Sequence, residues 1–528
     1  MGIYINRGNA AFRQYTNGEY VDKTAMIAYI NTTVDTADKL TCVSRPRRFG
    51  KSMAAHMLNA YYDKSCDSRE LFSRFAIAKD QSFEEHLNKY PTIYLDITDF
   101  TTRYQGREDI VELIQAAVIK DIRKAYPDVE VDEGCDLMDV LLNVNMATGE
   151  KFVMIIDEWD ALCREADDKP RLMDNYVNLL RRLFKGGGTA MVFACVYMTG
   201  ILPIKRYGTQ SALNDFREYS MTNASDLAGY IGFTESEVRQ LCEKYGMNYE
   251  DMKGWYDGYS FGQDYPAVFN PNSVMQACKR HTYDNYWGKT SAFETLQQYV
   301  DLDMTGVQES LDRIIKGEAA KVSVLRFGFD LNSVGSDDEL ITLFIHLGYL
   351  AYNVESSTVS IPNKEIRMEF VEALRGSKTH KELSALIKTS DRLMEATMNK
   401  DERLVAEIIE QLHTSTAGPD FYNNEQALRS VLKIGYLSAI DDFVSIQELP
   451  TGKGYADLAL IPRRGSRKSA VVIELKWNHP VEAAIDQIRR QQYPEVLSHF
   501  ADNLLLVGIT YDEKTKRHSC QISEHQAK

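Results

Sequence analysis

The chain has 528 residues, of which 44% are hydrophobic and 26% are charged, a balance typical of a globular protein with two to four domains. Its formal net charge of −15 argues against a surface that attracts nucleic acid everywhere, and the lack of an apolar run of about 18 residues argues against a transmembrane helix. Eight scattered cysteines without a Cys-x-x-Cys pair argue against a zinc cluster, and with no apolar signal sequence they predict a cytoplasmic protein that needs no membrane.

The first informative segment is a loop that ends in Gly-Lys-Ser, between a predicted strand at 39–44 and a predicted helix at 52–63. A loop between a strand and a helix N-terminus can surround nucleotide phosphates with backbone N–H groups. Lys51 would neutralise the β- and γ-phosphates, and the Ser52 hydroxyl would bind Mg²⁺. Arg45 stands where the usual motif has its first glycine, so a basic loop without a ligand is the alternative. The predicted nucleotide contacts in this loop are Arg47, Arg48, Phe49, Gly50, Lys51 and Ser52.

A second predicted site lies at the end of an apolar run at 151–160, which is typical of a buried parallel strand. Asp157 and Glu158 close this run, at the strand end where ligands bind in open α/β sheets. We expect Asp157 to bind Mg²⁺ and Glu158 to polarise the attacking water. The alternative is a strand that ends at an acidic helix cap.

Two further strands are predicted at 91–98 and 190–200. The second of them ends near Thr199. In additional-strand P-loop ATPases a polar residue at the tip of this strand senses the γ-phosphate, so the resemblance assigns that role to Thr199. Threonine is also an ordinary strand residue, and that alternative stays open.

The middle of the chain, at about 222–385, is predicted to be helical, for example at 224–245 and 341–352. The segment Gly-Trp-Tyr-Asp-Gly-Tyr at 254–259 has two interpretations: a packed turn, or aromatic rings that stack on a base. A charged helical stretch at 381–414 leads into the C-terminal part.

The C-terminal part differs from the rest in charge, since residues 421–528 hold 14 lysines and arginines against 13 aspartates and glutamates. Local basic segments, rather than chain averages, decide phosphate attraction. The basic run at 463–468 is therefore either a nucleic-acid contact or a solvated hairpin loop.

A predicted hairpin at 452–461 and 469–477 carries three charged residues of possible catalytic use. Side chains two apart on a strand share a face, so Glu474 and Lys476 point the same way. With Asp457 on the partner strand, this arrangement resembles that of PD-(D/E)XK nucleases. Asp457 and Glu474 would bind Mg²⁺, and Lys476 would orient or help deprotonate the attacking water. A surface strand with a Glu/Lys pair and no metal is the alternative.

The surroundings of this hairpin fit the same core. Glu425 opens a predicted helix and is a candidate fourth acid that could bind the metal. Pro480 suits the first position of a second helix, on which Gln487 and Tyr493 could approach the site. A final strand is predicted at 504–510. The order of these elements is that of the nuclease core.

Taken together, the chain resembles bacterial AAA-ATPase-like proteins with a C-terminal PD-(D/E)XK nuclease domain. In that family the phosphate loop tends to read Arg-Pro-Arg-Arg-Phe-Gly-Lys-Ser, so Arg45 is a family trait. The residues that carry the resemblance are Tyr20-Val21-Asp22-Lys23-Thr24, residues 45–52, Asp157-Glu158, Thr199-Gly200-Ile201, residues 254–259, Asn270-Pro271, Tyr286-Trp287, Gly348-Tyr349-Leu350, and Asp457, Glu474 and Lys476.

The resemblance implies an α/β fold in three parts. A P-loop NTPase domain at 1–221, with a parallel sheet and flanking helices, is followed by a helical lid and connector at 222–385. An α/β restriction-endonuclease-like domain with leading helices occupies 386–528.

The predicted function is ATP binding and hydrolysis that regulate a Mg²⁺-dependent nuclease acting on DNA or RNA. The predicted cofactors are ATP and Mg²⁺, DNA or RNA is the predicted partner, and a homo-oligomer is left open. The alternative is an ATP-dependent switch or scaffold, in which the nuclease-like domain only binds nucleic acid or a protein.

Overall fold

The computed structural model describes residues 2–132, 134–165, 169–204, 213–263, 265, 267–288, 296, 305–315, 318–324, 336–375, 377, 381–416, 425–451, 454–462, 468–490 and 503–526. The chain forms two compact units. The first consists of Met1–Tyr283, Met304–Val307 and Ala319–Asn363, and the second of Asp284–Asp303, Gln308–Glu318 and Lys364–Lys528. The division into three domains at 221 and 385 remains a prediction.

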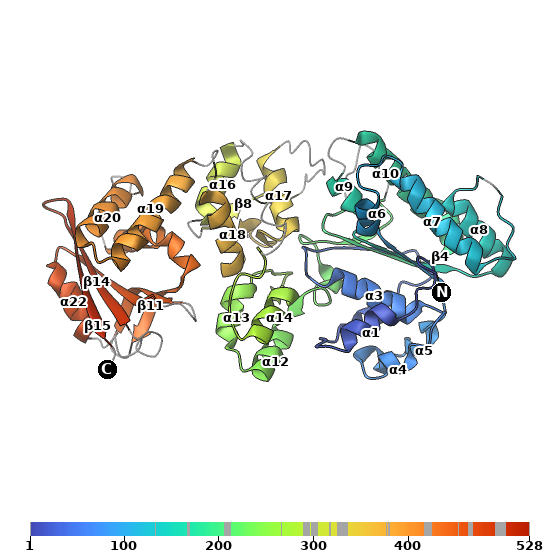
Figure 1. The fold of residues 1–528 in the computed structure, drawn as a ribbon, viewed down its shortest axis with the longest axis horizontal. Coiled ribbons are helices and arrows are strands. Elements are labelled where there is room, and N and C mark those ends of the chain that lie inside the picture. The colour runs from blue at the N-terminus through green and yellow to red at the C-terminus, as the bar shows by residue number, and fades with distance from the viewer. Residues whose placement is uncertain are drawn as a thin grey trace. The chain divides into compact units, whose positions relative to one another are not determined.

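The first unit is built on a five-stranded parallel sheet with the strand order β2-β3-β4-β1-β5. Every residue of β1, β3 and β4 is buried, because helices cover both faces of the sheet. Figure 1 shows α1 and α3 on one side of this sheet and α7, α8 and α10 on the other. The strands are β1 (Leu40–Ser44), β2 (Thr92–Asp96), β3 (Phe152–Asp157), β4 (Phe193–Gly200) and β5 (Arg217–Tyr219).

The helices of this part of the chain are α1 (Ala10–Thr16), α2 (Ala25–Asn31), α3 (Lys51–Tyr62), α4 (Arg69–Phe72), α5 (Phe83–His86), α6 (Ile97–Arg103), α7 (Ile110–Ala125), α8 (Leu137–Thr148), α9 (Ala161–Glu165), α10 (Pro170–Phe184) and α11 (Gly187–Val192).

Two of the predicted strands are shorter than expected. Strand β2 ends at Asp96, because the carboxylate of Asp96 accepts a hydrogen bond from Thr98 N and so caps helix α6. Strand β4 begins only at Phe193, since residues 187–192 form α11. The correction at β2 matters for function because it leaves Asp96 at the carboxyl end of the sheet.

The middle of the chain is less helical than predicted. Helix α12 begins at Glu235 rather than near Ala224, because Thr234 and Glu237 form a reciprocal capping box. Helix α17 ends at Leu347, where Gly348 adopts the left-handed conformation with φ +87°. The elements here are β6 (Phe233–Thr234), α12 (Glu235–Tyr245), α13 (Tyr249–Tyr256), β7 (Val268–Phe269), α14 (Pro271–Arg280), α16 (Thr305–Ile315), β8 (Ala320–Lys321), α17 (Asp337–Leu347), β9 (Ala351–Asn353) and β10 (Thr358–Ser360).

The aromatic segment at 254–259 is a packed turn. Trp255, Tyr256 and Tyr259 are at most 2% exposed, which leaves no ring face for a base. The Tyr259 hydroxyl donates to the carbonyl oxygen of Gly348, and its ring packs edge-on against Phe49 of the phosphate loop. This turn therefore connects the phosphate loop to the end of α17.

The second unit contains a mixed five-stranded sheet with the order β11-β12-β13-β14-β15, in which only β13 and β14 run parallel. The predicted helical stretch at 381–414 is two helices, separated at Lys400, which has φ +60°. The elements are α18 (Lys364–Arg375), α19 (Lys381–Met398), α20 (Glu402–Thr416), α21 (Glu425–Gly435), β11 (Phe443–Thr451), β12 (Gly454–Pro462), β13 (Ala470–Trp477), α22 (Val481–Arg490), β14 (Asn503–Asp512) and β15 (Arg517–Gln526).

Alternation along β13 divides the core of this unit into two layers. Val471, Ile473 and Leu475 pack with residues of α19, α20 and α21. Ala470 and Val472 pack with Ile485 and Ile488 of α22 on the other face. Within the described segments, every helix is too short or too polar to span a bilayer.

The turn at Gly258 offers a direct test of this packing. Gly258 has φ +112°, and a Cβ there would lie 2.0 Å from the carbonyl oxygen of Pro362. We expect Gly258→Ala to lower the free energy of unfolding by about 3 kcal/mol or more, because main chain must move to admit the methyl group. Gly262→Ala is the matched control, since Gly262, four residues further along the chain, has φ +89° but open space around it. We expect the control to cost about 1 kcal/mol, the cost of the conformation alone. Equal thermal midpoints for the two variants would contradict the packing described.

Candidate active sites

The phosphate loop joins the end of β1 to the start of α3. Gly50 has φ +93° and forms the N-cap of α3, and a Cβ at this position would meet no atom within 4 Å. The left-handed conformation, rather than lack of space, therefore favours glycine here. The first turn of α3 leaves N–H groups without helical partners, which is the arrangement that binds phosphate.

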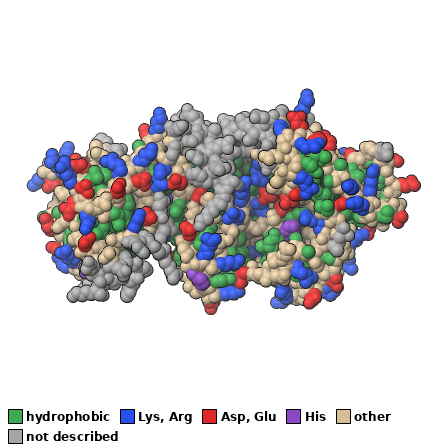
Figure 2. Space-filling model, in the orientation of Figure 1, with side chains coloured by type: hydrophobic (Ala, Val, Ile, Leu, Met, Phe, Trp, Pro, Cys, Tyr) green, Lys and Arg blue, Asp and Glu red, His purple; other side chains and the backbone are tan. Residues whose placement is uncertain are grey.

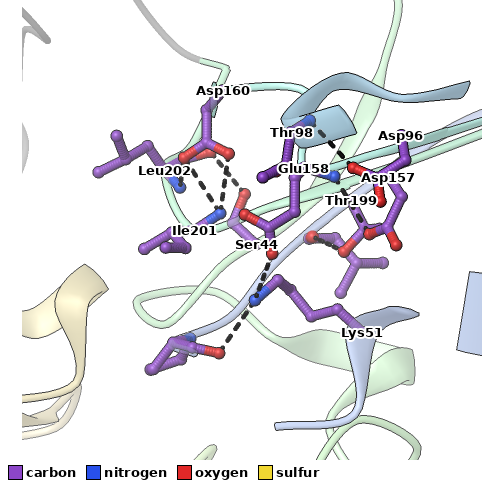
Figure 3. A network of polar contacts seen from close by, with 12 residues as sticks. Ser44, Lys51, Asp96, Thr98, Asp157, Glu158, Asp160, Thr199, Ile201 and Leu202 are labelled. Atoms are coloured by element: carbon purple, nitrogen blue, oxygen red, sulfur yellow. Dashed lines mark hydrogen bonds and ion pairs between the residues drawn. The ribbon is translucent and has the colours of Figure 1, made fainter. Parts of the chain in front are cut away.

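Lys51 lies at the floor of this loop and is only 3% exposed. Its Nζ donates to the carbonyl oxygen of Pro46 at 3.1 Å and lies 3.3 Å from Oε1 of Glu158. Figure 3 shows Lys51 between the loop and this acid. The structure thus brings together the lysine of the first predicted motif and the glutamate of the second.

Asp157 lies at the end of β3 and is 2% exposed. Burial raises its pKa to about 6, against the opposing effect of a hydrogen bond with Ser52. The carboxylate also accepts hydrogen bonds from the Tyr94 hydroxyl at 3.0 Å and from Glu158 N at 3.1 Å. Asp157 and Ser52 are therefore near each other, as two ligands of one metal ion must be.

Asp96 is a third acid at this edge of the sheet, and the sequence analysis did not single it out. It is the register partner of Asp157 on β2 and lines the same cavity as Ser52 and Lys51. Burial raises the pKa of Asp96 as well. The oxygen donors Ser52, Asp157 and Asp96 fit Mg²⁺, which prefers oxygen ligands and would offset the cost of the buried negative charge.

Glu158 is held by two cations. Its Oε1 faces Lys51, and its Oε2 lies 2.6 Å from Nη2 of Arg164 on α9. Burial opposes ionisation of Glu158, but the charges of Lys51 and Arg164 outweigh it and hold its pKa below the usual value. The backbone of Glu158 is left-handed, with φ +50°, which is uncommon for a residue other than glycine.

The structure places Thr199 near the end of β4, inside the parallel sheet. Thr199 is fully buried, and its hydroxyl donates to the carbonyl oxygen of Val43 on the adjacent strand at 3.1 Å. It is not among the described residues that line the cavity. The hydroxyl therefore has a hydrogen-bond partner inside the sheet, and the role of γ-phosphate sensor remains a prediction.

A cavity of about 860 Å³ opens over the phosphate loop. Its charged and polar lining includes Arg47, Arg48, Lys51, Ser52, Asp96, Thr98, Glu158 and Arg164. Its apolar lining includes Tyr20, Val21, Met53, Met57, Phe233 and Met275. Met53 and Met57 continue along α3 away from its N-terminus, so apolar side chains follow the polar ones along the helix, beside Glu19 and Lys23, which also line the cavity. This combination suits a ligand with a charged tail and an aromatic ring.

Two ion pairs fix the wall at the apolar end. Lys23 donates to Glu237 at 2.6 Å and to the carbonyl oxygen of Gly229 at 2.8 Å. Glu19 pairs with Lys244 at 2.7 Å. Both pairs join the segment at 18–23 to α12 and the residues before it. Sequence reasoning missed this wall, because its partners lie more than 200 residues apart and form no local motif.

The second candidate site lies where β12 and β13 separate. Their paired register ends at Leu458 and Ile473. Beyond that point the side chain of Asp457 continues the pairing, since its Oδ2 accepts a hydrogen bond from Leu475 N at 2.9 Å. Its Oδ1 lies 2.7 Å from Nε of Arg429 on α21. Asp457 is therefore a buried acid fixed to the main chain of the neighbouring strand.

Glu474 lies next to that contact and is 2% exposed. Its Oε1 accepts hydrogen bonds from Lys476 Nζ at 3.0 Å and from Nε2 of Gln487 on α22. The residue that pairs with Glu474 on β14 is Gly508. Because glycine has no side chain, helix α22 can pack closely there and reach Glu474. A Cβ at Gly508 would lie 3.0 Å from Cβ of Ala484. Glu474 and Lys476 thus share one face of β13, as the alternation predicted.

Other predicted residues of this site lie partly outside the described structure. Glu425 begins α21, but its side chain lies outside the described part, as does Tyr493. Of the basic run at 463–468 only Lys468 is described, and it pairs with Asp442. On the face shown in Figure 2, acidic and basic side chains of the described residues are interspersed.

Neither site contains a large cluster of metal ligands. Among the described residues, His, Cys, Asp and Glu side chains form no group of three or more that could hold a metal ion. Mg²⁺ often binds through one or two carboxylates together with waters and substrate phosphates. The oxygen donors around Ser52 fit that mode of binding, and the binding of one Mg²⁺ by Asp457 and Glu474 stays a prediction.

Comparison with known proteins agrees with this geometry. Residues 10–209 match a family model described as "Predicted AAA-ATPase", and residues 423–520 match one described as "PD-(D/E)XK nuclease superfamily". These matches and the two sheets confirm the α/β fold class and the predicted resemblance. No curated protein matches the chain.

Three solved structures resemble the chain at 10–11% sequence identity. They are the Aeropyrum pernix ORC2 protein in ADPNP-ADP complexes (10% identity, TM-score 0.27, 69% of this chain and 94% of that chain), a DNA replication initiation factor (10%, 0.26, 71% and 97%), and the Aeropyrum pernix ORC1 protein in complex with DNA (11%, 0.26, 72% and 99%). Because these TM-scores are low, the fold assignment rests on the strand order and the family matches.

The close packing of α22 on β14 generates a prediction for the second site. Gly508→Val adds three carbon atoms where even a Cβ is in tight contact with Ala484 and Val481. We expect the variant to lower the free energy of unfolding by about 1–3 kcal/mol, the usual cost of overpacking. Gln487→Ala, which removes the α22 contact with Glu474 but leaves this packing in place, should cost less. Chemical denaturation of both variants checks this, and an unchanged midpoint for Gly508→Val would contradict it.

Proposed function

We propose that this chain, which joins an AAA-ATPase-like domain to a C-terminal domain of the PD-(D/E)XK nuclease superfamily, hydrolyses ATP to control Mg²⁺-dependent cleavage of DNA or RNA. One observation supports the ATPase assignment most. Lys51 of the phosphate loop and Glu158 at the end of β3 meet at 3.3 Å at the floor of one cavity. The two motifs are about 100 residues apart in the sequence, yet they meet beside the N-terminus of α3, where phosphate binds. Unrelated segments would not be expected to meet at such a place.

The triphosphate would lie on the N-terminus of α3, with Lys51 on its β- and γ-phosphates. Arg47 and Arg48 line the same polar end of the cavity and add positive charge. Phe49 lines the cavity and packs against Tyr259, so it would hold the loop rather than the phosphates. The base would occupy the apolar end between Met53, Met57 and the wall fixed by Lys23 and Glu19.

Hydrolysis would use the acids at the sheet edge. Ser52 and Asp157, with Asp96 beside them, would hold Mg²⁺, which neutralises developing charge on the phosphates when it is bound. Glu158 would orient and polarise the attacking water, a role for an ionised carboxylate. Its lowered pKa keeps that carboxylate ionised at neutral pH.

In the C-terminal domain, Asp457 and Glu474 would hold Mg²⁺. Lys476 lies beside Glu474 on the same face and would orient or help deprotonate the water that attacks the phosphodiester. Gln487 contacts Glu474 and would fix its orientation. Glu425 remains a predicted further acid of this site.

The switch or scaffold function is the second candidate, and one observation favours it. Arg429 pairs with Asp457 at 2.7 Å, so a cation of the chain itself already balances that buried acid. A domain balanced in this way can remain folded without a metal ion and bind nucleic acid or a protein without cutting. Under this alternative, ATP binding would change the availability of that surface.

The first test concerns ATP. We expect Lys51→Ala to weaken ATP affinity by about 10- to 100-fold, the usual worth of charge-assisted contacts of about 1.5–3 kcal/mol. Glu158→Gln should bind ATP but hydrolyse it much more slowly. Lys468→Ala serves as the control, since Lys468 lies in the C-terminal domain and pairs with Asp442. Calorimetry with ATP and a phosphate-release assay measure the two effects, and equal affinities for wild type and Lys51→Ala would disprove the assignment.

The second test concerns cleavage. Purified protein would be incubated with plasmid, linear DNA, single strands and RNA, with and without ATP and Mg²⁺. We expect Asp457→Ala and Lys476→Ala each to remove cleavage while ATP turnover stays nearly unchanged, because the two sites use different residues. Lys51→Ala should alter the cleavage rate if ATP controls the nuclease. No cleavage of any substrate by the wild type would support the switch or scaffold instead.

A further inference from the structure

Arg164 on α9 contacts two acids, Glu158, which follows β3, and the buried Asp160. Its Nη2 lies 2.6 Å from Oε2 of Glu158, and its Nε lies 3.2 Å from Oδ2 of Asp160. Asp160 directly precedes α9 and Arg164 lies four residues further along the chain, so this pair spans one helical turn. The Nη2 contact with Glu158 is a hydrogen bond, whereas the Nε contact with Asp160 is an ion pair without hydrogen-bond geometry. A planar guanidinium can face two carboxylates at once, which the single ammonium group of a lysine does less well.

Asp160 is fixed by hydrogen bonds from the main chain beyond β4. It is completely buried, and its carboxylate accepts hydrogen bonds from Ile201 N and Leu202 N, just beyond β4. Gly200 lies directly against it, since a Cβ there would be 2.5 Å from Asp160 Oδ1. Figure 3 shows Asp160 facing this main chain. Arg164 is therefore tied through Asp160 to the end of the central strand.

Lys51, on the other side of Glu158, is held differently. Its Nζ contacts the Pro46 carbonyl oxygen and the Glu158 carboxylate, each through a single pair of atoms. A bound triphosphate offers Lys51 several charged oxygens, so Lys51 is the cation that can leave Glu158 when nucleotide arrives. Arg164 keeps its buried partner Asp160 under the same conditions.

We propose that Arg164 is a positioning residue for the Glu158 carboxylate, which it holds against the end of β4 while nucleotide draws Lys51 away. The inference rests on the proposed ATPase function and deepens it. In the nucleotide-free chain both oxygens of Glu158 are engaged by cations. Nucleotide releases Oε1 for the attacking water, and Arg164 keeps Oε2 in place. Glu158 thus becomes available only after Lys51 has a phosphate to bind, which regulates the site through its own substrate.

The proposal differs from a phosphate-binding role for Arg164, although the arginine lines the cavity. An arginine that bound phosphate would contribute to affinity, and its loss would weaken ATP binding. A positioning arginine contributes to the rate instead, because it acts on the carboxylate that orients water. Measuring both ATP affinity and the rate of ATP turnover therefore distinguishes a phosphate-binding arginine from a positioning arginine.

The experiment compares Arg164→Ala and Arg164→Lys with Arg182→Ala. Arg182 is the matched control, since it also pairs with two carboxylates, Asp136 at 2.8 Å and Asp139 at 2.6 Å, but does so on an exposed surface. For Arg164→Ala we expect kcat to fall by at least about 10-fold, because a positioned general base contributes about 10²–10⁴ to the rate. The dissociation constant for a non-hydrolysable ATP analogue should stay within about threefold. Arg164→Lys should retain intermediate turnover, and Arg182→Ala should match the wild type.

A second measurement uses the nucleotide-free protein and needs no ATPase activity. Carbodiimide labelling of carboxyl groups, read by peptide mass spectrometry, reports how firmly Glu158 is held, with Glu158→Gln to identify its signal. We expect faster labelling of Glu158 in Arg164→Ala than in wild type or Arg182→Ala. Unchanged labelling together with unchanged kcat would overturn the proposal, and a large loss of ATP affinity would assign Arg164 to the phosphates instead. A wild type that neither binds nor hydrolyses ATP would refute the proposed function, while the labelling result would still decide the role of Arg164.

Discussion

The cost of burying carboxylates at the ends of β-strands shapes both units of this protein. A charge removed from water needs a partner of opposite sign, a set of hydrogen bonds or a metal ion. At the edge of the parallel sheet, Asp157 takes hydrogen bonds from Tyr94 and Ser52, and Glu158 lies between Lys51 and Arg164. In the mixed sheet, Asp457 is held by Leu475 N and Arg429. Lys51 and Ser52, which stabilise acids of the first unit, are also proposed to bind the nucleotide and its Mg²⁺.

The strand order makes this arrangement possible in the first unit. Strand β4 lies between β1 and β3, so the phosphate loop and the paired acids leave the sheet two strands apart. The main chain beyond β4 then passes between them and binds Asp160, while Arg45 N donates to the carbonyl oxygen of Gly200. The phosphate loop and the acidic strand end are thus both attached to one central element, and a change at either can reach the other through it.

The sequence predicted the parts of this protein that are local. The apolar runs around Val43 and Ile155 and the alternation at Glu474 and Lys476 all correspond to observed strands. Element ends were less predictable, because caps such as Asp96 and the pair Thr234 and Glu237 compete with the hydrophobic pattern. Contacts between distant segments were predictable where motifs marked both partners, as for Lys51 and Glu158, and otherwise were not. Arg164 and Asp96 carry no motif, although an acid at the end of an apolar strand was a signal available for Asp96. Thr199 was assigned by its place on the strand, but its hydroxyl bonds within the sheet.

The two ion pairs in the wall at the apolar end of the cavity differ in their exposure to solvent. The pair of Lys23 and Glu237 is mostly shielded, with side chains 13% and 20% exposed, whereas the Lys244 side chain in the other pair is 58% exposed. Dissolved ions screen exposed charges much more than shielded ones. Rising ionic strength would therefore weaken the pair of Glu19 and Lys244 first, while the pair of Lys23 and Glu237 would still hold the segment at 18–23 to α12. The residence time of a molecule in the cavity would then depend on salt even though the phosphate end keeps its shape.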